Sequence, residues 1–130
     1  LESYNERLQT KNKRYFSGIS GKVEQKKTIV TDQGQNITFY DIFLYPKLWL
    51  LKFTKDHRIF SNKKTIDIIT TVLKENGITH LENLTSSCGK TIRDYCVQYG
   101  ESCFDFVSRL MEEEGIFYFF KHTPQGHTMV

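Results

Sequence analysis

Seven side chains of this sequence are of the types that bind transition metals or act as nucleophiles beside a base. They are the four histidines and the three cysteines, His57, His80, His122, His127, Cys88, Cys96 and Cys103. Structural zinc sites usually take ligands in pairs that are close in the chain, such as C-x-x-C. No two cysteines have that spacing, and the histidines fall in expected loops or strand ends without a paired motif. We therefore predict that the chain binds no metal.

A thiol nucleophile would require Cys103 to lie beside a base such as His122. Cys103 stands just inside an expected helix N-terminus, where a thiol pKa can be lowered; the alternative interpretation is an inert, partly buried cysteine. Neither Ser17 nor Ser20 stands in a G-x-S-x-G elbow, and the sequence has no P-loop and no dinucleotide fingerprint. We predict no catalytic residue, no cofactor-binding residue and no cofactor.

Glu112, Glu113 and Glu114 are the densest group of carboxylates, and they suggest metal ligation or acid–base chemistry. They are consecutive at an expected helix C-terminus, so they fan around the helix axis and cannot all converge on one ion. They also oppose the helix dipole. We interpret them as solvated or interface charges. A glycosidase would need two carboxylates roughly 5–10 Å apart in a cleft, and no such pair stands out, so we predict that the chain is not an enzyme.

The composition describes one ordinary domain, or two small ones, without a strong charge bias. The 130 residues carry 18 Lys and Arg against 15 Asp and Glu, a net charge of +3. A nucleic-acid binder usually has a larger basic surplus on one face, so we expect no nucleic-acid partner. Every apolar run is too short to span a bilayer. The chain opens on polar residues without Met, and we expect it to be a fragment of a longer protein.

The clearest structural pattern lies in residues 95–120. It begins with a strand whose expected apolar face is formed by Tyr95, Val97 and Tyr99. Ser102 and Asp105 have the S-x-x-D spacing of a helix N-terminus, and they predict a helix over 102–114. Two apolar rows of that helix point at a core, Phe106 with Leu110 and Val107 with Met111. Gly115 ends the helix, and the apolar residues 116–120 predict a further strand.

The first half of the chain predicts an antiparallel hairpin. We expect residues 1–13 to be frayed, or to belong to an element whose partners lie outside this chain. Residues 15–29 and 37–45 flank the turn cluster 32–36 and are expected to pair, with a bulge or bend at the glycines of the first strand. The second strand carries Phe39, Phe43 and Tyr45 on one face and Tyr40, Ile42 and Leu44 on the other. Apolar residues on both faces imply burial on both sides, within this chain or against another.

The middle of the chain predicts helices and loops. After Pro46, a mixed apolar pattern predicts a helical turn or short helix that buries Trp49. A second helix is predicted over 65–76, ended by Gly77, and its core face is expected to consist of Ile66, Ile69 and Leu73 with Val72 beside them. The remaining expectations are a loop over 79–92, a turn over 123–126 and a returning strand from residue 127.

Three segments together resemble the VgrG family, the spike proteins of bacterial type VI secretion, which is related to the tail hub proteins of contractile bacteriophages. They are "RYFSGISGKVEQ" (14–25), "YPKLWLLKFTKDHRIFSNKKTIDIITTVLKENGI" (45–78) and "YCVQYGESCFDFVSRLMEEEGIFYFF" (95–120). The resemblance covers roughly residues 14 to 130. The chain departs from the family at Lys64, where a small N-cap is frequent, at Ile66, where Pro is common, and at Gly100, where Arg is usual.

The resemblance implies an α+β fold, an antiparallel β-barrel portion followed by a small α+β unit with two helices. It divides the chain into a partial β-barrel (1–56), an α+β insertion unit (57–122) and the start of a second barrel strand (123–130). The family implies a homotrimeric spike base that caps a tube of stacked hexameric rings (Hcp-like) and carries a puncturing needle. Its partners would also include baseplate components and effector proteins. It would assemble in the bacterial cytoplasm and be secreted through the type VI apparatus.

Two other functions remain open from the residues. One is a phage-type tail hub or baseplate protein, whose distinguishing parts lie outside this sequence. The other is a cell-wall-binding module that grips sugar with exposed Tyr and Trp rings. The expected burial of Trp49 argues against the sugar-binding alternative.

Overall fold

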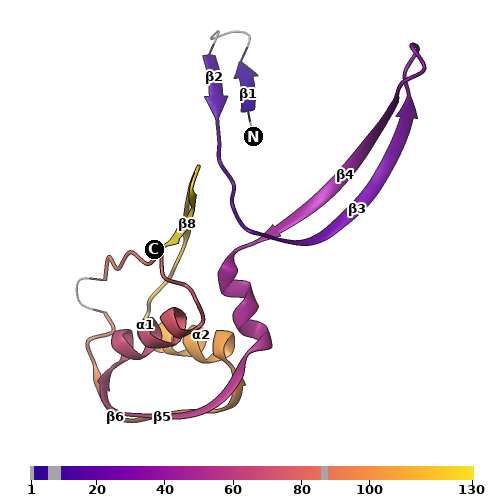
Figure 1. Cartoon of the computed structure of the whole chain (residues 1–130). Coiled ribbons are helices and arrows are strands. Elements are labelled where there is room, and N and C mark those ends of the chain that lie inside the picture. The colour runs from indigo at the N-terminus through magenta and orange to yellow at the C-terminus, as the bar shows by residue number, and fades with distance from the viewer. Residues whose placement is uncertain (1, 6–9, 86–87) are drawn as a thin grey trace.

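The computed structural model describes residues 2–5, 10–85 and 88–130, which form an α+β fold (Figure 1). In chain order the elements are β1 (Glu2–Asn5), β2 (Thr10–Lys13), β3 (Ile19–Val30), β4 (Asn36–Tyr45), the 3-10 helix η1 (Lys47–Phe53), β5 (Lys55–Lys64), α1 (Thr65–Glu75), β6 (Ile92–Ser102), α2 (Cys103–Glu113), β7 (Phe120–Thr123) and β8 (Gly126–Met129). The strands pair as β1–β2, β3–β4, β5–β6 and β7–β8, each pair antiparallel. No sheet of the described residues closes into a barrel.

Strands β3 and β4 form a long hairpin that projects from the rest of the molecule (Figure 1). They pair from Ile19 opposite Tyr45 to Val30 opposite Asn36, which confirms the predicted hairpin and its turn. The register shifts between Ser20 and Lys22, so the expected bulge at the glycines is confirmed. At Gly21 the bulge brings the backbone so close to the Tyr45 ring that an added Cβ would lie 2.5 Å from Cε2. Any residue with a Cβ there would require the Tyr45 ring to move.

The expectation for residues 1–13 needs correction. Residues 2–5 and 10–13 pair with each other as β1 and β2, from Glu2 opposite Lys13 to Asn5 opposite Thr10. A local antiparallel pair satisfies backbone groups without a distant partner, and a polar composition did not reveal it. Residues 1 and 6–9 lie outside the described residues.

The second part of the molecule is a two-stranded sheet, β5–β6, with α1 and α2 on the same side of it (Figure 1). Residues 55–64, left unassigned by the sequence, form β5. The predicted core face of β6 is wrong: Tyr95 and Tyr99 are 63% and 81% exposed, whereas Cys96 and Gln98 are buried. Side chains alternate along a strand, and the helices cover the face that carries Cys96 and Gln98. The pattern located the strand but reversed its faces.

Helix α2 agrees with its predicted N-terminus and core face. The Asp105 N–H donates to Ser102 Oγ at 3.0 Å, and Ser102 Oγ donates to Asp105 Oδ2 at 2.6 Å. The buried side chains are Cys103, Phe106, Val107, Leu110 and Met111. Gly115 has φ +65°, and the following N–H of Ile116 donates to Met111 O at 2.8 Å, a closing bond typical of a glycine C-terminus.

The strand predicted over 116–120 begins only at Phe120. Residues 116–119 are extended with alternating exposure, and within them Phe119 exchanges two backbone hydrogen bonds with Val130, at 3.0 and 2.9 Å. The apolar run 116–120 therefore contributes only its last residue to a strand. The predicted turn over 123–126 and the returning strand are confirmed as the β7–β8 hairpin.

Helix α1 ends one residue earlier than predicted, and Gly77 follows with φ +78°. Its buried residues are Thr65, Ile68, Ile69, Val72 and Leu73, so Ile68 takes the place assigned to Ile66. Lys64 offers no side-chain cap, as its departure from the family pattern implied. In the predicted loop over 79–92, Leu81 bridges to Met129 and β6 already begins at residue 92.

The short helix predicted after Pro46 is the 3-10 helix η1, which buries Leu48 and Leu51. Trp49 is only half-buried: its ring stacks on Tyr45, with centroids 4.7 Å apart, and meets the edge of Phe53 at 4.9 Å. The predicted burial of Trp49 is therefore only partial. Its partners are the last residue of β4, Tyr45, and the last residue of η1, Phe53, so these rings lie where the β3–β4 hairpin leads into η1.

Candidate interaction surfaces

The β3–β4 hairpin exposes apolar side chains on both of its faces. On β4, Phe39 and Phe43 point one way and remain 50% and 43% exposed, while Tyr40, Ile42 and Leu44 point the other way and remain 56%, 59% and 49% exposed. Val23 and Val30 of β3 are exposed as well. The burial expected for both faces is therefore not supplied by the chain itself. Contiguous apolar surface of this kind marks an interaction site.

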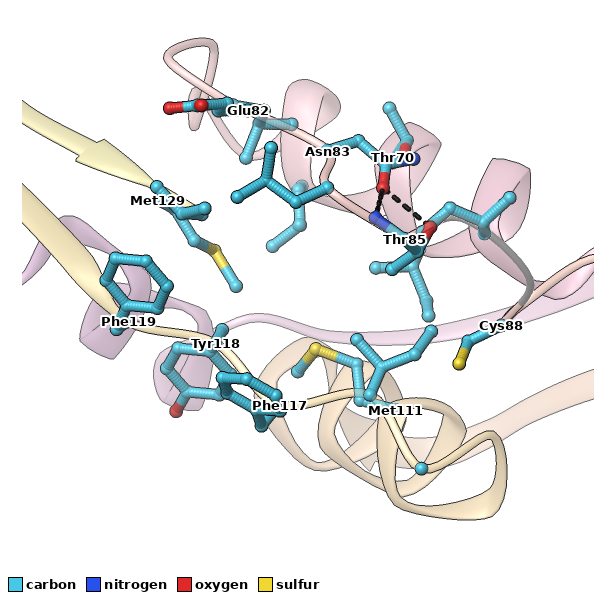
Figure 2. Close-up of a pocket in the computed structure, with 18 residues that line it drawn as sticks. Thr70, Glu82, Asn83, Thr85, Cys88, Met111, Phe117, Tyr118, Phe119 and Met129 are labelled. Atoms are coloured by element: carbon cyan, nitrogen blue, oxygen red, sulfur yellow. Dashed lines mark hydrogen bonds between the residues drawn. The ribbon is translucent and has the colours of Figure 1, made fainter.

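An apolar pocket of about 280 Å³ lies between α1, the segment around Glu82–Thr85 and the segment after α2 (Figure 2). Its apolar lining includes Ile69, Leu73, Met111, Phe117, Tyr118 and Met129. The Thr85 N–H and Oγ both donate to Asn83 Oδ1, at 2.8 and 2.6 Å, and these bonds shape the rim. The lining suits apolar contact. Sequence reasoning missed this pocket because its walls come from four separate segments.

Glu113 and Glu114 are not the solvated charges that the sequence suggested. Glu114 Oε1 accepts from Thr65 Oγ1 at 2.8 Å and from Arg93 Nη2 at 3.3 Å, while Oε2 accepts from the Gly89 N–H at 3.2 Å and Thr91 Oγ1 at 3.3 Å. The Thr65 hydroxyl, with help from Arg93, lowers the pKa of the Glu114 carboxyl below its usual value. This carboxylate therefore joins the end of α2 to the start of α1 and to the segment before β6.

Glu113 forms the second half of this network. It pairs with Arg93 at 2.7 Å and with Arg109 at 3.2 Å, and the hydrogen bond from Arg93 lowers the pKa of its carboxyl. Glu112 is exposed and remains the solvated member of the three. Because Glu113 and Glu114 already meet arginines, their arrangement is that of a structural ion-pair network.

The structure separates the cysteine and histidine side chains considered as a thiol–base pair. Cys103 is fully buried, and its sulfur accepts from Gln98 Nε2 at 3.5 Å and Arg58 Nη2 at 3.6 Å. His122 instead lies against Ser17, with its Nδ1 3.3 Å from Ser17 Oγ. The interpretation of Cys103 as a buried thiol is thus the better one.

The other two cysteines lie apart, whereas His122 and His127 lie beside each other on the β7–β8 hairpin. Cys96 is buried, and desolvation raises the pKa of its thiol, while Cys88 is exposed. His57 meets the edge of Tyr99 at 5.2 Å and lies next to Gly100, which has φ +65°. Over residues 2–5, 10–85 and 88–130, no three His, Cys, Asp or Glu side chains are grouped so that they could hold a metal ion. In the same part of the chain, no helix is long and apolar enough to cross a membrane.

The comparisons with known proteins cover nearly the whole chain. The family model described as phage tail baseplate hub (GPD) matches residues 4–130. The type VI secretion system spike protein VgrG1c of Pseudomonas aeruginosa is 44% identical over 119 residues, which is 92% of this chain and 16% of that protein. The actin cross-linking toxin VgrG1 of Vibrio cholerae is 38% identical over 98 residues, 75% of this chain and 9% of that protein.

A solved structure has the same fold. The E. coli c3393 protein, a component of the type VI secretion system with structural similarity to the T4 bacteriophage tail proteins gp27 and gp5, matches with a TM-score of 0.67. The match covers 98% of this chain and 34% of that one, at 23% identity. The chain therefore spans a small part of the length of each of these proteins.

Proposed function

We propose that this chain, which belongs to the phage tail baseplate hub family, is part of the base of a VgrG-like spike in a contractile injection machine. The proposal rests on the family match over residues 4–130 and on the named spike proteins that share 43–44% of the aligned residues. It assigns the chain a structural role, without catalysis, cofactor or metal. The function of such a structural protein depends on the surfaces that its fold leaves free to bind other strands or subunits.

The exposed β3–β4 hairpin is the observation that carries this proposal. A hairpin that is apolar on both faces and uncovered by its own chain offers surface that other strands or subunits can bury. We propose that residues 1–56 belong to one β-barrel that is completed by strands outside this chain. Residues 57–122 then form an insertion unit, and residues 123–130 begin a second barrel. Three copies packed around an axis would cover the other face.

The proposed partners follow from the same assignment. The trimeric base would cap a tube of stacked hexameric rings (Hcp-like), contact baseplate components, and carry a needle and effector proteins. Assembly in the bacterial cytoplasm, followed by secretion through the type VI apparatus, completes the proposal. It is supported by relatives named as spike proteins of that system.

A charge placed on the hairpin tests the proposal. In the full-length protein, Ile42→Asp replaces a 59% exposed apolar side chain with a carboxylate. We expect it to turn trimers into monomers, because the charge would have to be buried without a partner on assembly. Mass photometry measures the change, and circular dichroism checks that the fold persists.

Ile59→Asp is the matched control, since it makes the same substitution at a 60% exposed isoleucine on β5, outside the hairpin. The control is expected to stay trimeric. Trimers of undiminished stability in the Ile42→Asp variant would show that this face of the hairpin is not an assembly surface.

A phage-type tail hub is the second candidate. The description of the matching family favours it, as does the similarity of the c3393 protein to T4 tail proteins. The two functions share the same fold and the same uncovered hairpin. Co-purification separates them, because a secretion spike should retain a type VI tube protein and a phage hub should retain a phage tail tube protein.

A further inference from the structure

Two histidines of the β7–β8 hairpin hold the base of the β3–β4 hairpin at both of its ends. His122 on β7 lies opposite His127 on β8, and their ring centroids are 5.9 Å apart. Ser17 comes just before β3, and Lys47 comes just after β4. His122 Nδ1 lies 3.2 Å from the Ser17 backbone nitrogen and 3.3 Å from Ser17 Oγ. His127 Nδ1 lies 3.3 Å from Ser17 Oγ, and its Nε2 lies 3.3 Å from the Lys47 backbone nitrogen.

These contacts fix the proton positions on both rings. A backbone N–H can only donate, so His122 Nδ1 must accept from Ser17 and His127 Nε2 must accept from Lys47. His122 therefore carries its proton on Nε2. A neutral His127 must carry its proton on Nδ1, which donates to Ser17 Oγ. The Ser17 hydroxyl can then direct its hydrogen at His122 Nδ1, where it shares the single lone pair with the Ser17 N–H. The four contacts are compatible only with two opposite tautomers.

Protonation of either ring breaks this arrangement. A second proton on His122 would place Nδ1–H against the Ser17 N–H, and one on His127 would place Nε2–H against the Lys47 N–H. Two imidazolium rings at this separation would also repel each other. These contacts between the β7–β8 hairpin and the base of the β3–β4 hairpin therefore form only when both imidazole rings are neutral.

The charged surroundings of the two rings add to this effect. His80 and the Lys47 side chain are the other titratable groups that act on His127, and Lys121, which follows Phe120 on β7, is engaged by Glu82 at 2.7 Å. The pKa of His127 is lowered, first by burial and then by His122; a hydrogen bond with the Ser17 backbone opposes this shift, and His80 and Lys47 add smaller lowering effects. Phe16 and Phe120 pack against the rings and contribute no charge.

We propose that Ser17, Lys47, His122 and His127 form a proton-operated latch that closes the β3–β4 hairpin onto the β7–β8 hairpin when both imidazoles are neutral and releases it when they are protonated. Opening of the latch frees the β3–β4 hairpin, whose apolar faces are the proposed assembly surface. The orientation of this hairpin is therefore coupled to pH.

The pH window follows from linkage. In the open state the His127 imidazole has its ordinary pKa of 6.5, and in the closed state its pKa is lower. The closed state therefore binds fewer protons at His127, so its advantage is complete above 6.5 and decreases as the pH falls through the lowered pKa. Between these two pKa values the equilibrium changes by up to about tenfold for each pH unit.

Two NMR measurements on the 130-residue chain test the latch. Long-range ¹H–¹⁵N spectra at pH 7.5 should show His122 with its proton on Nε2 and His127 with its proton on Nδ1. Amide hydrogen exchange should show protection factors for Ser17 and Lys47 that fall by up to about tenfold between pH 7.5 and 5.5.

The double variant His122→Gln/His127→Gln should lose this pH dependence, because glutamine can accept the same N–H donors and does not titrate there. His57→Gln is the control, since His57 lies against Tyr99 and away from the latch, and it should keep the response. The same Nε2–H tautomer on both rings, or protection factors that do not change with pH in the unsubstituted chain, would overturn the proposal. The tautomer measurement requires no variant, so it decides even if the double variant fails to fold.

Discussion

Leu110→Ala is expected to lower the free energy of unfolding by about 2–5 kcal/mol. Leu110 is fully buried on α2, among the residues that pack this helix against η1 and α1. The substitution removes apolar contacts and leaves a cavity that the surrounding side chains can only partly fill. In a domain of this size, such a loss is a large part of the total stability.

Urea unfolding, followed by the fluorescence of Trp49 and by circular dichroism, measures this change. Leu84→Ala is the matched control: the same side chain is removed where it is 64% exposed, and the expected cost is below about 1 kcal/mol. Equal costs for the two variants would mean that α2 does not pack as the structure shows.

Glu114→Gln is expected to lower the free energy of unfolding by about 1.5–3 kcal/mol. The carboxylate oxygens accept four hydrogen bonds, and an amide nitrogen in place of either oxygen cannot accept two of them. The change also removes one of the two carboxylates that meet Arg93. Glu112→Gln is the control, because the exposed Glu112 side chain takes no part in this network.

The effect of Glu114 should depend on pH. Its pKa is lowered in the folded chain, chiefly by the Thr65 hydroxyl, so the folded state binds fewer protons than the unfolded state as the pH falls. The stability difference between the unsubstituted chain and Glu114→Gln is therefore full above the ordinary glutamate value of 4.5 and shrinks as the pH falls through the lower folded value. Urea titrations at pH 7 and at pH 3 measure it. A difference that is the same at both values would contradict a role for the charge.

Local signals in the sequence identified the elements whose ends are defined by local chemistry. The Ser102–Asp105 cap and Gly115 fix the bounds of α2 through bonds within a few residues, and the turn at 32–36 fixes the pairing of β3 with β4. These features depend on short-range hydrogen bonds and backbone conformation. Neighbouring residues alone are therefore enough to predict them.

Features that depend on distant partners were not predicted. The face of β6 that packs is chosen by where α1 and α2 lie, and Tyr95 and Tyr99 are large enough to look like core residues although they face outward. Glu114 looked solvated because its partners Thr65, Gly89 and Arg93 are 21 to 49 residues away in the chain. The histidine contacts to Ser17 span more than 100 residues, and no short motif announces them.

For the β3–β4 hairpin, the local structure was predicted from the sequence, but the groups that cover its two faces were not. Its alternating apolar residues predicted two faces that need cover, which follows from strand geometry alone. The sequence left open whether this chain or another one supplies the cover. The structure leaves Phe39, Tyr40 and Ile42 at least half exposed, so this chain does not supply the cover itself.

Hydroxyl-radical footprinting of β4 measures whether the hairpin becomes covered when the full-length protein assembles. The aromatic side chains Phe39, Tyr40 and Phe43 report on both faces of the hairpin, and their oxidation rates are compared between the isolated 130-residue chain and the assembled full-length protein. Tyr99, which is 81% exposed on β6, serves as the internal reference. We expect rapid oxidation of the three β4 residues in the isolated chain and strong protection of all three in the assembly. Equal oxidation in both samples, relative to Tyr99, would contradict the assignment of this hairpin as the assembly surface.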